Sequence, residues 1–213
     1  YIQRVMMCDF SEVSFKNGNI NFKANVTPVS LQNRGDRKAA FKRELQEITR
    51  TSPFVVTGTC WISIDYYCQH VKRIKNPGAY DIDNIIKPIL DSLVGQAGLI
   101  LDDVLVDRVT VNWIDTPHED HIEIQVEYPD LLFCGKDDLV LIKHRSGWCF
   151  PIHRQIAQSD KGMELIQQYF DIWNSIDDEH AFNASVWMLP IQNFVYFTKV
   201  RESGFEIIEL KCS

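Results

Sequence analysis

"AYDIDNIIKPILDSLVG", residues 79–95, combines an apolar helical face with a flank of charged side chains. We predict a helix here that begins near Asp83, a suitable N-cap, and ends at the glycines that follow. At 100° per residue, Asp83, Lys87 and Asp91 fall on one flank. The opposite arc carries the apolar positions Ile85, Ile86, Ile89, Leu90 and Leu93. One face of this helix therefore belongs to a core, and the other gathers charge.

More carboxylates lie on either side of this helix, which leaves two interpretations open. Asp81 precedes it, and an Asp102-Asp103 pair follows the glycine turn. Acids at a helix N-terminus are common and stabilise the helix, so the region can be a solvated edge. A dense carboxylate cluster, however, needs a cation or raised pKa values to persist in a compact fold. If a strand brings Asp102-Asp103 back alongside, the acids form a pocket for a divalent ion, and Lys87 is placed to stabilise charge on a phosphodiester.

The segments around the helix predict a small α/β unit. We expect a strand over 19–28, a helix over 35–50 and one long strand over 54–68. An extended segment over 99–113 and a strand over 121–128 follow the acidic helix. The resulting order is β-α-β-α-β-β.

A second unit is predicted after a boundary within 129–138. It comprises an apolar strand over 139–143, a helix that begins near Ser159 and a β-hairpin over 193–210. The fold class is therefore α+β, with a small mixed-sheet α/β domain over 1–130 and a small α+β domain of unknown role over 131–213.

Composition is that of an ordinary globular protein, with no apolar run long enough to predict a membrane span and no signal peptide. We expect a cytoplasmic protein, nucleoid-associated if bacterial. The formal charge of the 213 residues is −7, which argues at first against nucleic-acid binding. Residues 1–130, however, hold 14 Lys/Arg against 18 Asp/Glu, and six of these acids lie between positions 81 and 107. The acidity is therefore partly a property of one site.

The acidic stretch resembles a known family. "DIDNIIKPILDSLVG…LDDVLVDRVTV" is similar to the signature of RusA-type Holliday junction resolvases, D-x-D-N-x-x-K-x-x-x-D-A-L followed by D-D and a strand. The upstream "PVSLQNRGDRKAAFKRELQEI" resembles the start of the same family, so the likeness covers roughly residues 20–128. It implies a RusA-like homodimer that cuts branched DNA by Mg²⁺-dependent phosphodiester hydrolysis in recombination and repair, with Mn²⁺ as a substitute ion. The additional C-terminal domain and the acidic charge depart from the family pattern.

Carried over by motif, the resemblance assigns roles to individual residues. Asp81, Asp83 and Asp103 match the essential metal-site acids and Lys87 the essential lysine, and these four are the catalytic candidates. Asp102 matches the neighbouring acid and is a further metal ligand. Asn84 and Asp91 match supporting positions.

Basic residues upstream of the motif are candidate DNA contacts, because Lys and Arg side chains can follow phosphates. They are Arg34, Arg37, Lys38, Lys42, Arg43, Lys72, Arg73 and Lys75. The alternative function is a non-catalytic resolvase-like binding or interaction module whose activity lies in residues 131–213.

Overall fold

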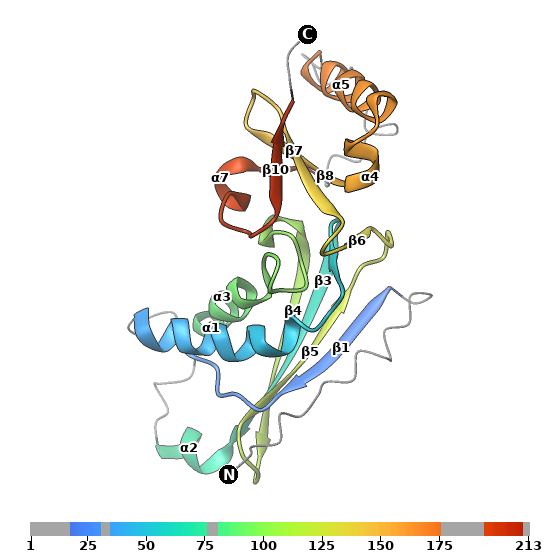
Figure 1. Ribbon diagram of the computed structural model, residues 1–213. Helices are drawn as coiled ribbons and strands as arrows, with labels where there is room; N and C mark the ends of the chain where they lie inside the picture. The colour runs from blue at the N-terminus through green and yellow to red at the C-terminus, as the bar shows by residue number, and fades with distance from the viewer. Residues whose placement is uncertain (1–17, 31–34, 76–80, 176–193, 211–213) are drawn as a thin grey trace, which may run out of the picture.

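The computed structural model describes residues 18–30, 35–75, 81–175 and 194–210, and the statements below concern these residues. They form two four-stranded sheets and a two-stranded ribbon, each with helices nearby (Figure 1). None of the described helices has the length and apolarity needed to cross a membrane.

The first sheet has the strand order β1-β5-β3-β4. Its strands are β1 (Asn19–Ala24), β3 (Cys60–Gln69), β4 (Val106–Thr116) and β5 (His121–Glu127). All neighbours are antiparallel except β3 and β4, which run parallel. In β3 and β5 buried and partly exposed residues alternate, so one face of the sheet is core and the other is largely polar.

Two helices cover the apolar face of this sheet. In α1 (Gly35–Thr49) the buried residues Phe41 and Leu45 are one turn apart, and in α3 (Ile82–Leu93) Ile89 and Leu93 have the same spacing. These side chains share one core with the sheet. The two helices also pack against each other, whereas the short α2 (His70–Lys75) lies at the far end of β3 (Figure 1).

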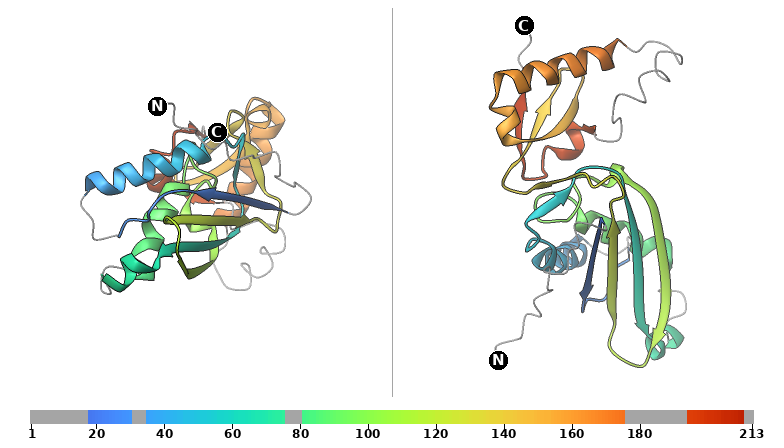
Figure 2. Two further views of the ribbon diagram at one scale, coloured as in Figure 1. Left: turned by 90° about the horizontal axis from the view of Figure 1, so that it is seen from below. Right: turned by 90° about the vertical axis from the view of Figure 1, so that its right-hand side faces the viewer.

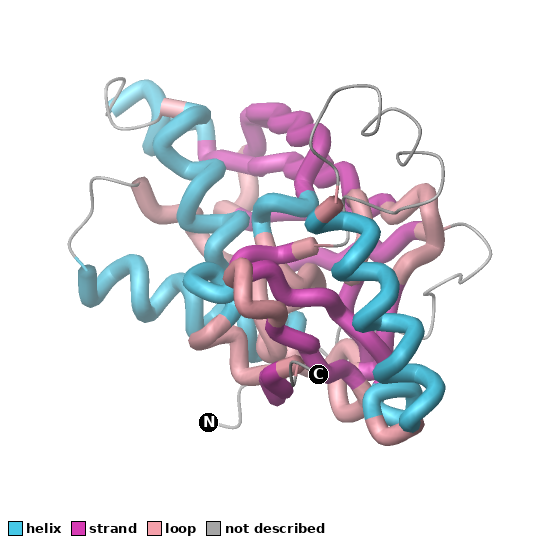
Figure 3. Tube along the Cα trace, turned by 90° about the horizontal axis from the view of Figure 1, so that it is seen from above, coloured by secondary structure: helices cyan, strands magenta, loops and turns pink. Residues whose placement is uncertain are grey.

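The second sheet has the order β10-β7-β8-β9 and is covered on both faces. Its strands are β7 (Leu139–Lys143), β8 (Trp148–His153), β9 (Val195–Tyr196) and β10 (Glu206–Glu209). On one face, Val140 and Ile142 pack with Phe170 of α5 (Asp160–Asn174), which follows the short α4 (Arg154–Ala157). The other face looks towards α7 (Phe197–Val200) and the first sheet's unit (Figure 2). Seen from above, helices flank the strands of the molecule (Figure 3).

The two units share a hydrophobic core. Leu101 and Leu105, which follow α3, pack with Leu139 and Leu141 of β7 and with Val200 of α7. A two-stranded ribbon of β2 (Phe54–Val56) and β6 (Phe133–Gly135) also crosses the predicted boundary at residue 130. That boundary remains a prediction, because residues on both sides of it belong to one packed arrangement.

The predicted α+β class is confirmed, and three local expectations are wrong. The 54–68 segment is two strands, β2 and β3, because the chain turns at Gly58, where a Cβ would lie 2.6 Å from the Leu132 side chain. The acidic helix begins at Ile82 with Asp81 as N-cap, so Asp83 is inside its first turn. The predicted hairpin does not form, since β9 and β10 lie at opposite edges of the second sheet with α7 between them in sequence.

Candidate active site

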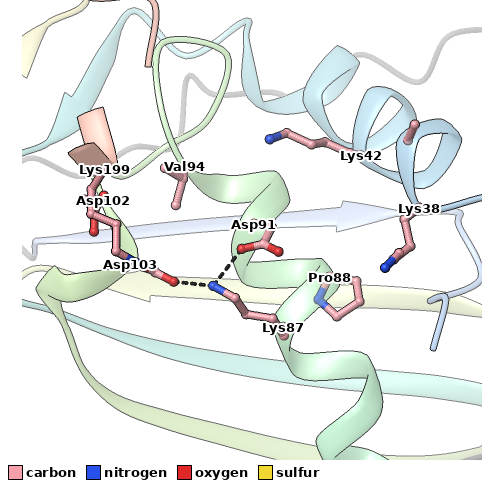
Figure 4. Close-up of a pocket in the computed structure, with 10 residues that line it drawn as sticks. Lys38, Lys42, Lys87, Pro88, Asp91, Val94, Asp102, Asp103 and Lys199 are labelled. Carbon is pink, nitrogen blue, oxygen red and sulfur yellow. Dashed lines mark hydrogen bonds and ion pairs between the residues drawn. The ribbon is translucent and has the colours of Figure 1, made fainter. Parts of the chain in front are cut away.

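A cavity of about 390 Å³ lies where α1, α3, α7 and the turn before β4 meet. Figure 4 shows that Lys87 of α3 lies between two carboxylates, with lysines of α1 on the opposite wall. The lining residues are Lys38, Ala39, Lys42, Lys87, Pro88, Asp91, Val94, Asp102, Asp103 and Lys199. The cavity therefore combines four lysines with three aspartates.

The amphipathic helix α3 presents Lys87 and Asp91 to this cavity. Its buried Ile85 and Ile89 anchor the opposite face in the core. Lys87 Nζ lies 2.8 Å from Asp91 Oδ1, the contact that an i, i+4 pair on one flank makes. Asp83 lies one turn before Lys87 on the same helix. The predicted charged flank is therefore present.

A tight turn after α3 brings the Asp102-Asp103 pair alongside Lys87. Gly95 has a φ of +86°, and a Cβ on Gly98 would lie 1.9 Å from the Leu93 carbonyl oxygen, so both positions favour glycine. The amides of Leu99 and Ile100 donate to Leu93 O and fold the chain back on the helix end. The short 3-10 turn Asp103–Leu105 then carries the acids to the cavity.

Lys87 joins the helix to the acidic turn. Its Nζ donates to Asp103 Oδ2 at 2.5 Å and also pairs with Asp91. Burial of the ammonium acts to lower its pKa, but the hydrogen bonds to Asp103 and Asp91 outweigh that effect and raise it. Lys87 is thus a protonated group held between two carboxylates.

The neighbouring carboxyls Asp102 and Asp103 differ in environment. Asp102 is 2% exposed and accepts a hydrogen bond from the Val104 amide at 2.9 Å. Burial, together with the hydrogen bond and charge of Asp103, raises the pKa of Asp102. Burial also acts to raise the pKa of Asp103, but the hydrogen bond and charge of Lys87 lower it overall. A proton added to the pair therefore favours Asp102.

Asp81 and Asp83 form a second carboxylate pair at the start of α3. Both are exposed, and neither lines the cavity. A hydrogen bond with Asp83 and the charge of Asp83 raise the pKa of Asp81. Asn84 lies beside them, and its amide donates to Asp81 O at 3.1 Å. The motif thus places two carboxylate pairs on either side of Lys87 along the chain.

The donor chemistry of these pairs fits a hard divalent cation, which prefers carboxylate oxygens. Each pair also contains a carboxyl whose pKa is raised: burial is the main cause for Asp102, and the hydrogen bond with Asp83 is the main cause for Asp81. The charge of the neighbouring aspartate adds to both shifts, and a bound cation would relieve that repulsion. In the described part of the chain, however, no three His, Cys, Asp or Glu side chains gather in an arrangement that could hold a metal. The structure brings Asp103 into contact with Lys87 and leaves Asp81 and Asp83 outside the cavity, so the two pairs are candidate ligands without a completed cage.

The predicted DNA-contact residues lie on two different helices, α1 beside the cavity and α2 at the far end of the first sheet. Lys38 and Lys42 of α1 line the cavity, and Arg37 and Arg43 are exposed on the same helix. Lys72 and Lys75 lie on α2 at the far end of the sheet. Lys72 Nζ pairs there with the buried Asp120 at 3.1 Å.

Two of the predicted contacts lack a structural description, and one charged residue of the cavity was not expected. Arg34 and the side chain of Arg73 lie outside the described residues. Lys199 of α7 reaches the cavity, and its Nζ lies 3.8 Å from Asp103 Oδ1. No motif spacing connects Lys199 to the acids, so only the fold reveals it.

Comparison with known proteins places this site in a family. No curated protein matches the chain. A family model described as endodeoxyribonuclease RusA matches residues 27–127, which include α1, α3 and both carboxylate pairs. No helix or strand of the second sheet's unit falls within that range, although α7 contributes to the cavity. Residues 27–127 are therefore a domain of the RusA endodeoxyribonuclease family.

Proposed function

We propose that the protein is a Mg²⁺-dependent endonuclease that cleaves four-way junctions or other branched DNA during recombination and repair. The observation that carries this proposal is the protonated Lys87 held between Asp91 and Asp103, beside the Asp102 carboxyl, in a cavity of a RusA-family domain. Such an arrangement provides a positive charge for a phosphate and oxygen ligands for a cation. Mn²⁺, with the same preference for oxygen ligands, is expected to substitute.

In this proposal Asp81, Asp83, Asp102 and Asp103 hold the metal. A divalent ion bound there would supply charge to the phosphodiester and lower the pKa of a water molecule. Lys87 contributes its ammonium to a phosphate oxygen, where it stabilises the negative charge that grows as the bond to phosphorus forms. Asp91 orients Lys87 through the 2.8 Å ion pair, and Asn84 supports the helix start.

We infer a homodimer, because two such sites would cut symmetric strands of a four-way junction in pairs. Lys38 and Lys42 border the cavity and are the strongest candidates for contacts to DNA phosphates. Arg37 and Arg43 are exposed on the same helix and extend this basic surface. Equilibrium sedimentation of the full chain, with and without junction DNA, tests the dimer.

The decisive experiment is cleavage of a labelled synthetic four-way junction in Mg²⁺, compared with the same reaction in EDTA. We expect Asp83→Asn and Asp103→Asn to remove cleavage, whereas Asp137→Asn, at an exposed position outside the cavity, keeps it. Linear duplex of the same sequence controls for structure selectivity. Absence of metal-dependent cleavage of any branched DNA would contradict the proposal.

The alternative of a non-catalytic binding module gives a different result in the same samples. A module of that kind binds the junction, but cleavage and a stoichiometric Mn²⁺ signal at the carboxylates are both absent. Titration of Mn²⁺ followed by electron paramagnetic resonance, with Asp103→Asn as control, separates the two functions.

A further inference from the structure

The cavity contains one lysine that comes from outside the RusA-family domain. Lys199 belongs to α7, beyond the matched residues 27–127, yet it lines the same cavity as Lys87 and Asp103 (Figure 4). Its side chain is 59% exposed, and its Nζ lies 3.8 Å from Asp103 Oδ1. An exposed pair at this distance contributes little to stability, so the ammonium can exchange Asp103 for another anion at small cost.

The position of α7 is set by packing against the acidic turn itself. Val200 is fully buried in the same core as Leu101 and Leu105, the residues that flank Asp102 and Asp103. The turn is therefore anchored on the same hydrophobic cluster as the helix that carries Lys199.

Polar contacts fix both ends of α7. The Phe197 amide donates to Gly147 O at 2.8 Å, and Lys143 Nζ lies 4.2 Å from the centre of the Phe197 ring. On the other side, the Gln96 amide donates to Ser203 O at 2.8 Å, which joins the chain after α7 to the glycine turn after α3. Lys199 is thus a long side chain on a fixed base at the edge of the cavity.

The lysines approach the carboxylates from separate elements. Lys38 and Lys42 extend from α1, whereas Lys199 lies beside the Asp102-Asp103 turn (Figure 4). A polyanion laid across the cavity would meet cations from both the family domain and the second sheet's unit. Strong attraction between cations and phosphates is the sequence-independent part of DNA binding.

We propose that Lys199 binds a backbone phosphate of the DNA substrate, so that the unit formed by residues 131–213 completes the substrate-binding surface of the nuclease site. This inference rests on the proposed function. It gives that unit a role in positioning DNA, beside its packing against the acidic turn. In it, Lys199 exchanges its contact with Asp103 for a contact with a backbone phosphate.

The test is the salt dependence of DNA binding by the full-length protein. A fluorescent four-way junction is titrated by anisotropy between 50 and 200 mM KCl, with Ca²⁺ as the oxygen-preferring divalent ion. Each phosphate contact contributes about 0.9 to the slope of log K against log salt. We expect Lys199→Gln to lower that slope by about 0.9, so that its affinity changes about 3.5-fold less than wild type across this range.

Matched variants make the result specific. Lys161→Gln, at an exposed position of α5 outside the cavity, should keep the wild-type slope, and Lys199→Arg should keep it as well. Thermal unfolding of each variant checks that the exposed substitution leaves the fold intact.

The outcomes separate the inference from the function on which it rests. If wild type binds and cleaves junctions but Lys199→Gln keeps the full slope, the inference is overturned and the nuclease stands. If Lys199→Arg loses as much slope as Lys199→Gln, positive charge is not what position 199 supplies, and the inference is also overturned. If wild type neither binds nor cleaves branched DNA, both are overturned.

Discussion

The two sheets differ in how they are covered. The first sheet buries one face under α1 and α3 and leaves the other largely polar, whereas β7 of the second sheet is buried on both faces. One face of β7 packs on α5, and the other contributes Leu139 and Leu141 to the core that contains Leu101 and Leu105. The second sheet therefore uses the family domain as one of its two covering layers. Units joined in this way are expected to unfold together, and the following predictions test that expectation.

The largest expected effect comes from Leu101→Ala in the shared core. Leu101 is fully buried, and truncation of such a leucine costs about 2–5 kcal/mol of unfolding free energy. Hydrogen exchange by mass spectrometry in increasing urea reports each sheet separately. We expect peptides of both sheets to lose protection at the same, lower urea concentration.

Val140→Ala is the matched control, because Val140 is buried on the α5 side of β7, away from the family domain. It should also lower the urea midpoint of both sheets if unfolding is cooperative. Loss of protection in the second sheet alone, with the first unchanged, would show that the units are independent.

A second prediction concerns Lys136, which joins the start of the second unit to the end of α1. Its ammonium is buried and donates to Thr49 O at 3.1 Å, and burial together with the charge of Arg50 lowers its pKa from 10.5 to about 8. Between these values the unfolded chain binds a proton that the folded protein does not, so the unfolding free energy rises with pH. The rise attributable to Lys136 is about 3 kcal/mol across this window.

Lys136→Met should remove this rise. The measurement is urea unfolding of both proteins from pH 7 to pH 10. The quantity compared is the slope of the unfolding free energy against pH. Lys161→Met, an exposed lysine, should keep the wild-type slope. Parallel curves for wild type and Lys136→Met would contradict the assignment.

A third prediction tests the role of Lys87, which joins α3 to the acidic turn, through the cleavage rate. Lys87→Met should lower the rate of junction cleavage by about 100-fold, equivalent to about 2.7 kcal/mol, because one charge-stabilising donor is lost. The single-turnover rate at saturating protein is the measurement, since it separates chemistry from binding. A rate within a few-fold of wild type would show that Lys87 acts only as a structural partner of Asp91 and Asp103.

The smallest effect is expected at the far end of the first sheet, where Asp120 accepts from the Gln69 amide at 2.9 Å and pairs with Lys72. Burial acts to raise the Asp120 pKa, but these partners lower it below its ordinary 3.8. Its stabilisation is therefore present above about pH 4 and lost as the pH falls through the depressed pKa. Because Lys72 is half exposed, we expect Asp120→Asn to cost only about 1 kcal/mol at pH 7.

Asp120→Asn should leave the second sheet's local exchange rates and the cleavage rate unchanged. The difference in unfolding free energy between Asp120→Asn and wild type, measured by urea unfolding, should be smaller at pH 3 than at pH 7. A constant difference at both pH values would mean that the cost of the substitution does not depend on the charge of Asp120.

Local patterns predicted much of the first unit. The alternation in β1 and β5 and the apolar arc of α3 are properties of consecutive residues. The glycines at 95 and 98 likewise predicted the turn that brings Asp102 and Asp103 back towards the helix. The role of each aspartate came from a family motif, and the structure adds the contacts of Asp91 and Asp103 with Lys87 and the burial of Asp102.

The second unit was harder to predict because its pairing is not local. The aromatic run at 194–197 has the composition of a strand, but the chain becomes helical at Phe197, whose amide bonds to Gly147 O. β10 then joins β7 in parallel at the opposite edge from β9, a pairing that no turn residue signals. Lys199 could not be predicted for the same reason, since its neighbours in space are far away in sequence.

The core under the Asp102-Asp103 turn has a consequence for how the protein folds as it is synthesised. This core includes Val195, Val200 and Phe205, which the ribosome adds about a hundred residues after the acids. Until then the turn lacks the side chains that hold it, and long-range closure of this kind is slow. A growing chain would thus carry its acidic motif for some time before the turn is held in place, so that the proposed nuclease site forms only after residues 195–205 have been synthesised.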